Sequence, residues 1–109
     1  MLFRKIFRIR DALLSVTDNV GHYEALNVSD KYLVWAEDAE ADSVHADNQK
    51  DIQVIQGTID YFTKEDGDPN VDRVQTALLG AEGVVYQLNS VQYEDETGYI
   101  HYEWLWEVS

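Results

Sequence analysis

The residues of this 109-residue chain that are best suited to chemistry are its carboxylates, many of which gather in one acidic segment. Residues 37–51, EDAEADSVHADNQKD, place His45 among five of these carboxylates: Glu37, Asp38, Glu40, Asp42 and Asp47. Oxygen ligands of this kind suit Ca²⁺ or Mg²⁺, but a tight loop site needs ligands at fixed alternate positions and a glycine for its sharp turn. The segment has neither, so we interpret it as a solvated acidic loop and expect no metal or other cofactor.

The remaining candidates for catalysis have plainer interpretations. The stretch EDGDPN, residues 65–70, begins like a calcium loop, but Asp68-Pro69 is a typical helix start with an Asx cap and proline at the first position. His22 lies in a predicted loop, and His101 lies on the polar side of a predicted strand, where we expect a cross-strand polar contact rather than a catalytic role. There is no cysteine, no glycine-rich phosphate loop and no serine at a strand–elbow–helix turn. We therefore predict that the protein is not an enzyme.

The charge of the chain is large, negative and unevenly distributed. The formal net charge is −13, yet half of the eight basic residues precede the first acid, Asp11: Arg4, Lys5, Arg8 and Arg10. Removing their +4 from −13 leaves −17 for residues 11–109. Such a body repels nucleic acid and anionic membranes, whereas the basic segment can meet an acidic neighbour. We therefore predict a subunit interface between residues 4–10 of one copy and the acidic residues 37–47 of another.

The elements that position these charges are best defined at the end of the chain. In residues 98–108, GYIHYEWLWEV, alternate side chains are apolar, with Tyr99 and Leu105 as exceptions on the polar side. This period of two predicts a strand with one buried face, which carries Trp104 and Trp106. Because tryptophans bury so much apolar area, we expect this strand to dominate the core.

The other elements follow from similar patterns. Helical spacing predicts helices over residues 2–16 and from Pro69 to Gly80 or Gly83, and residues 17–30 are predicted to be a connecting loop. Strands are predicted at 31–37, 52–64, 84–93 and 98–108, with a bulge at Gly57. In the third of these strands, the parity of the apolar residues predicts two opposite faces, one with Val84, Tyr86 and Leu88 and the other with Val91 and Tyr93. Residues 95–98 are predicted to close a hairpin.

The order α-β-β-α-β-β predicts a single α+β domain over residues 1–109. It is a two-layer sandwich, in which a four-stranded antiparallel sheet has both helices on one face. The start MLFRKIFRIRDALL lacks an uninterrupted apolar core and a cleavage site, and no segment approaches the roughly 20 apolar residues of a membrane span. We expect a soluble intracellular protein that does not bind membranes.

The succession of segments resembles a known protein family. After the first helix come a strand of the type YLVWAED, an acidic loop, a strand ending in IDYFTKED, a helix DPNVDRVQTALLGAEGV and a hairpin SVQYEDETGYIHYEWLWEV. This pattern covers nearly the whole chain and is similar to the small tail-terminator, or tail-completion, proteins of long-tailed bacteriophages and prophages. These proteins join the tail to the head.

The resemblance implies a structural assembly protein, found in the virion and, during assembly, in the host cytoplasm. Copies of the chain would form a ring, typically a hexamer, that caps the tail tube and docks on head-completion proteins. DNA would pass through an acidic lumen without sequence-specific binding, because binding requires lysine and arginine to neutralise phosphates.

Three other interpretations remain open. One is an acidic inhibitor that mimics DNA and occupies a nucleic-acid-binding protein, which the net charge of −13 on a small domain motivates. Another is a different phage neck or minor tail component. The third is a small enzyme or metal protein, which the missing motifs disfavour.

Overall fold

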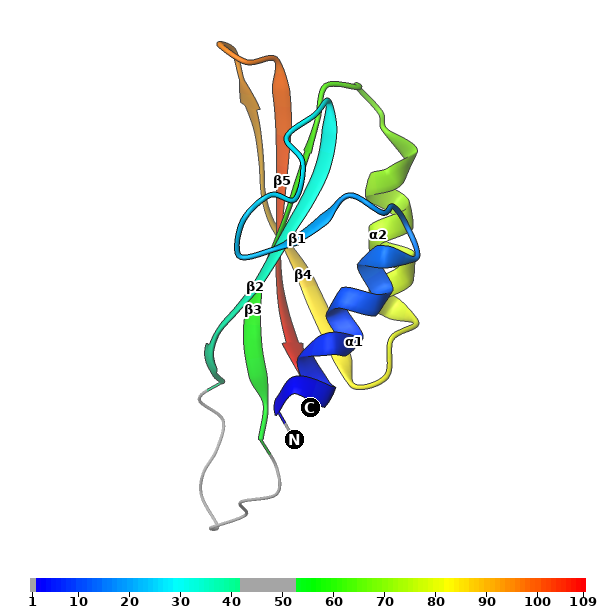
Figure 1. The fold of residues 1–109 in the computed structure, drawn as a ribbon, viewed down its shortest axis with the longest axis vertical. Coiled ribbons are helices and arrows are strands. Elements are labelled where there is room, and N and C mark those ends of the chain that lie inside the picture. Colours follow the sequence, from blue (N-terminus) through cyan, green and yellow to red (C-terminus); the bar gives the residue numbers. More distant parts are fainter. Residues whose placement is uncertain (1, 42–52) are drawn as a thin grey trace.

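The computed structural model describes residues 2–41 and 53–109, which fold into an α+β domain with two helices and a five-stranded mixed sheet. The elements are α1 (Leu2–Leu14), β1 (Val20–His22), β2 (Lys31–Glu40), β3 (Ile55–Thr63), α2 (Pro69–Leu79), β4 (Val84–Glu94) and β5 (Tyr99–Val108). Figure 1 shows both helices on the same side of the sheet. The predicted α+β class and the two helices are confirmed.

The sheet differs from the predicted four-stranded antiparallel one by an additional strand. Its order is β1-β2-β3-β5-β4, with β1 parallel to β2 and all other neighbours antiparallel. The additional strand, β1, lies in the segment predicted to be a loop, and its three residues are too few to show a period of two. It is held by backbone hydrogen bonds at both ends, from Leu33 N to Asn19 O at 3.0 Å and from Tyr23 N to Trp35 O at 2.8 Å.

The core lies between the helices and one face of the sheet, which we call the covered face. Trp35, Trp104 and Trp106 are its largest side chains, and each is at most 1% exposed. The prediction that Trp104 and Trp106 share the buried side of the last strand is confirmed. The helices contribute the remaining apolar layer, with Ile6, Ile9 and Leu13 from α1 and Val74 and Leu78 from α2.

The indole nitrogens in this core are also satisfied. Trp104 Nε1 donates to Gln75 Oε1 on α2 at 3.0 Å, and Trp106 Nε1 donates to the carbonyl oxygen of Thr58 at 3.0 Å. Buried indoles need such acceptors, because an unpaired buried donor destabilises the fold. The two hydrogen bonds therefore fix the orientation of both rings.

The bulge predicted at Gly57 lies instead in the neighbouring strand. β3 keeps one buried face along its whole length, whereas the register with β2 shifts between Glu37 and Ala39. Gly57 itself is required by close packing: a Cβ there would be 2.1 Å from Ala36 O and 2.4 Å from Trp106 Cζ2. The glycine thus marks a close approach of an indole ring and the β2 backbone, rather than a change of face.

A second bulge corrects the predicted faces of β4. The register with β5 shifts between Leu88 and Ser90, after which Val91 lies opposite Tyr102 and Tyr93 lies opposite Ile100. Opposite residues in an antiparallel pair share a face. Val91 and Tyr93 therefore belong to the same face as Tyr86 and Leu88, and the prediction that they lie on the other face was wrong. The extra residue of the bulge shifts the alternation by one position, so that Val91 and Tyr93 return to the face that holds Tyr86 and Leu88.

The predicted boundaries of α2 and of the last hairpin are confirmed. Asp68 is the N-cap of α2, Pro69 is its first residue, and Gly80 follows its last turn. Residues 95–98 form the turn between β4 and β5, with Gly98 at a φ of +79°. A positive φ favours glycine because other residues lose energy through their Cβ.

Candidate subunit interface

The four basic residues predicted to form an interface all lie on α1, but most of them are engaged within their own chain. Lys5 Nζ donates to Gln53 O at 2.6 Å. Arg8 Nη1 donates to Glu82 O at 3.1 Å and to Ser109 O at 2.9 Å. Arg10 pairs with Asp11 at 3.0 Å and lies 4.0 Å from the centre of the Phe7 ring. Arg4 is exposed and forms no hydrogen bond or ion pair with any residue in 2–41 or 53–109.

The three predicted acidic partners that the structure describes do not form one surface. Glu37 is engaged by His22 of β1 and by the following Tyr23, Asp38 lies at the bulge of β2, and Glu40 is exposed at the end of that strand. Asp42 and Asp47 lie outside the described residues. Gln56 Nε2 donates to Asp38 Oδ1 at 3.3 Å, which places this carboxylate over β3.

Glu37 is part of a stacked cluster at the short edge of the sheet. The His22 ring lies between Tyr23 and Trp35, with ring centroids 3.9 Å and 3.8 Å away. Glu37 Oε1 lies 2.8 Å from His22 Nε2, and its second oxygen accepts from the Tyr23 hydroxyl. Burial acts to raise the pKa of Glu37, but the hydrogen bonds from Tyr23 and His22 prevail and lower it. This carboxylate therefore stabilises β1 and is not a free interface residue.

The face of the sheet that no helix covers, which we call the outer face, carries a shallow groove that the sequence pattern did not predict. The groove has a volume of about 260 Å³ and extends over four strands, from Asp38 on β2 past Gln56 on β3 to Leu105 and Glu107 on β5 and Val85 on β4. Val85 is 63% exposed and Leu105 is 38% exposed. Leu105 was one of two exceptions to the alternation in the last strand. An apolar residue on the polar side of that strand was the feature of the sequence that could have indicated an apolar site on the outer face.

The other exception, Tyr99, belongs to an aromatic cluster at the opposite end of the outer face. Phe62 stacks on Tyr32 at 4.7 Å and on His101 at 4.2 Å, and the Tyr99 ring meets Phe62 edge-on at 6.0 Å. These half-buried rings cover one another where no helix does. The cluster therefore explains why Tyr99 interrupts the polar side of β5.

Asp60 connects this cluster to the acidic part of the outer face. His101 Nε2 lies 2.7 Å from Asp60 Oδ1. Burial raises the pKa of Asp60, the hydrogen bond from His101 opposes that shift, and the nearby Glu103 reinforces it. The cross-strand polar contact expected for His101 is confirmed.

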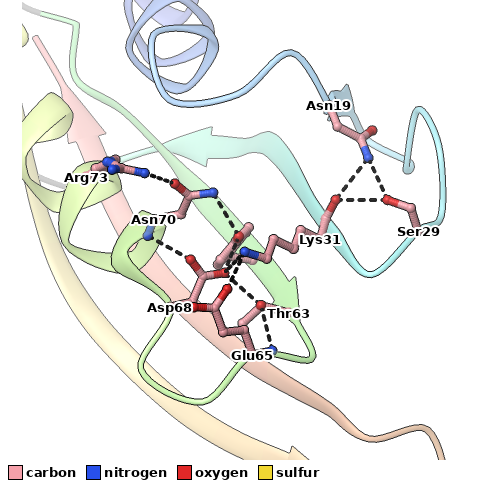
Figure 2. A network of polar contacts seen from close by, with 9 residues as sticks. Asn19, Ser29, Lys31, Thr63, Glu65, Asp68, Asn70 and Arg73 are labelled. Carbon is pink, nitrogen blue, oxygen red and sulfur yellow. Dashed lines mark hydrogen bonds and ion pairs between the residues drawn. The ribbon is translucent and has the colours of Figure 1, made fainter.

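The most densely connected polar group is the cap of α2, shown in Figure 2. Asp68 Oδ2 accepts from the hydroxyls of Tyr61 and Thr63, each at 2.7 Å, and Asp68 Oδ1 accepts from Asn70 N at 2.9 Å. Lys31 Nζ lies 3.5 Å from the same carboxylate and 2.5 Å from Glu65. The carboxylate joins the end of β3 to the start of α2, which is a structural role.

The electrostatics of this network agree with that role. Burial acts to raise the pKa of Asp68, but the hydrogen bonds from the Asn70 amide, Thr63 and Tyr61 outweigh it and lower the pKa. Burial, together with the hydrogen bond to Asp68, raises the pKa of Tyr61 to about 12. The residues EDGDPN thus form a helix cap, as the sequence predicted.

Within residues 2–41 and 53–109, no group of three or more His, Cys, Asp or Glu side chains is arranged to hold a metal ion. Neither described helix is both long and apolar enough to cross a membrane.

Comparison with known proteins assigns no family: no protein-family model matches the chain, and no curated protein gives a significant match. The similarity to phage tail-terminator proteins therefore stays a prediction from the sequence pattern.

Proposed function

We propose that this protein is a structural subunit of a phage or prophage tail, which forms a ring that caps the tail tube and joins tail to head. The observation that carries the proposal is the segregation of charge: half of the basic residues lie on α1, and residues 11–109 have a net charge of −17. Opposite charges on different surfaces of one chain favour the association of copies in a repeating direction.

The acidic body suits a channel for DNA. Three carboxylates lie on the outer face or at its ends, outside the groove: Asp60, Glu94 and Glu103. Duplex DNA adheres to proteins chiefly by exchanging its counterions for lysine and arginine side chains. A surface of carboxylates repels the phosphates, and DNA can slide past it.

The test is electron microscopy of the purified protein mixed with tail tubes from the phage or prophage that carries it. We expect a ring at one end of each tube and tubes of constant length. In parallel, a gel-shift measurement at low salt is expected to show no retention of duplex DNA. Tubes that stay uncapped, or a protein that retards DNA, would contradict the proposal.

A charge reversal links this test to the basic helix. Arg4→Glu is the cleanest change, because Lys5 and Arg8 also donate hydrogen bonds within the chain, so that reversing them perturbs the fold as well. We expect Arg4→Glu to reduce capping. Arg73→Glu is the control for charge, since it makes the same charge change at an exposed position of α2. Because Arg73 Nη1 also donates to Asn70 Oδ1 at 2.9 Å, circular dichroism of this variant verifies that it remains folded.

A further inference from the structure

We propose that the groove on the outer face of the sheet receives the exposed N-terminal end of α1 from a second copy of this chain. This inference deepens the proposed ring and rests on it, because it names the two surfaces that would meet. It keeps the basic helix and Asp38 from the predicted contact between residues 4–10 and residues 37–47, and adds Glu107 on β5 as a second acidic partner.

The groove has the size and lining of a site for side chains. Its volume of about 260 Å³ lies below the range of roughly 300–1,000 Å³ that is usual for small-molecule pockets. Val85 and Leu105 give it an apolar floor, while Asp38 and Glu107 supply negative charge. An occupant must therefore combine an apolar group with a positive one.

The first turns of α1 present that combination. Phe3 is 62% exposed and stacks at 6.0 Å on Phe7, which is half-buried and packs against the core, so the exposed ring is supported from beneath. Arg4 is exposed next to Phe3, and Arg10 lies over Phe7. In the described part of the chain, no other helix or strand combines an exposed aromatic side chain with two arginines.

The geometry of one copy requires the occupant to come from another copy. α1 lies on the covered face of the sheet (Figure 1) and packs there through Ile6, Ile9 and Leu13. The groove opens on the opposite face of the same sheet. A copy therefore cannot fill its own groove. When two copies join in this way, one groove and one α1 remain free, so the contact can repeat from copy to copy, and it gives a ring where the rotation between copies closes.

Disulfide trapping tests the contact directly, because the chain has no cysteine of its own. Phe3→Cys and Val85→Cys are made in separate chains that carry tags of different mass, mixed and oxidised. We expect the mixed dimer to form several-fold faster than either dimer of identical variants. The control pairs Phe3→Cys with Leu79→Cys, which is 76% exposed on α2 and outside the groove, and is expected to cross-link slowly.

Charge reversal supplies an independent readout. Arg4→Glu in the Phe3→Cys chain, or Glu107→Lys in the Val85→Cys chain, is expected to lower the cross-linking rate. Combining both variants is expected to restore most of it, which a mere loss of folding in either chain would not produce. Circular dichroism of each variant verifies that both remain folded.

The outcomes separate this inference from the proposed function. Equal rates for all cysteine pairs, or preferential linking of Val85→Cys to itself, would overturn the groove contact and indicate random collision or pairing of two β4 strands. Mixed cross-links without capped tubes would support the contact and contradict the tail role. Capped tubes without mixed cross-links would support the tail role and overturn this contact.

Discussion

The two faces of the sheet are built from the same strands and differ in what makes them stable. On the covered face, three tryptophans and the apolar residues of both helices are excluded from water. On the outer face, half-buried rings stack on one another beside carboxylates, and apolar side chains such as Val85 stay exposed. The difference indicates that the covered face determines the fold, while the outer face is free to carry charge and to bind partners.

The largest expected difference between the two faces is tested by truncating neighbouring residues that point to opposite faces. Trp104→Ala removes a fully buried ring and its hydrogen bond to Gln75, and is expected to lower the free energy of unfolding by about 3–5 kcal/mol. Leu105→Ala, one residue away on the outer face, is expected to cost less than about 1 kcal/mol. Urea unfolding followed by circular dichroism measures both. Equal losses would show that the two faces contribute alike.

Adding a methyl group tests how closely the covered face is packed. Gly57→Ala places a Cβ against the Ala36 carbonyl and the Trp106 ring, so we expect a loss of about 3 kcal/mol from overpacking. Gly67→Ala is the control, because nothing lies within 4 Å of its added Cβ and only its φ of +72° opposes the change, at about 1–2 kcal/mol. Thermal unfolding of both variants checks the order, and a milder effect at Gly57 would mean that the β2 backbone gives way.

The polar network at the start of α2 depends on Asp68 for its stability. Asp68→Ala leaves Tyr61, Thr63 and Asn70 without their acceptor, which is expected to cost about 2–3 kcal/mol at pH 7. Because the pKa of Asp68 is lowered by folding, its ionised form stabilises the protein above the unfolded-state pKa of about 3.9. This contribution is lost as the pH falls through that value and the lower folded-state pKa. The difference in unfolding free energy between the wild type and Asp68→Asn is therefore expected to shrink on acidification.

Asp60 on the outer face is expected to behave in the opposite way, with the smallest effect. Since burial raises its pKa, its ionised form is disfavoured in the folded protein, and this penalty disappears as the pH falls through the folded-state pKa towards about 3.9. Relative to Asp60→Asn, the wild type is expected to gain less than about 1 kcal/mol of stability between pH 5 and pH 3. Urea unfolding at a series of pH values measures how the unfolding free energy of the wild type, relative to Asp60→Asn, changes with pH. A loss of stability on acidification, as expected for Asp68, would contradict the prediction.

Local patterns in the sequence were sufficient to predict features that depend only on residues within one helix or strand. The alternation around Trp104 and Trp106 predicted the buried side of β5, and Asp68-Pro69 predicted the start of α2. These features depend on the period of two in a strand and on the chemistry of a cap, which neighbouring residues express directly.

Features that depend on distant partners were not predictable in this way. The three residues of β1 show no period, and its position depends on backbone hydrogen bonds to β2. The bulge between Leu88 and Ser90 reverses the parity of everything after it, so counting along β4 assigned Val91 to the wrong face. For the site, charge alone grouped Lys5 and Arg8 with Arg4, because nothing in the sequence indicates which carbonyl oxygens lie near each side chain.

The bulge in β4 also affects how strongly the protein tends to aggregate at high concentration. β4 is an 11-residue strand at the margin of the sheet, and such a margin can recruit further strands and grow into fibres. The irregularity at Asn89 breaks the repeat of backbone donors and acceptors midway, so an incoming strand cannot keep its register past that point. A protein with this bulge can accumulate at high concentration without templating its own aggregation.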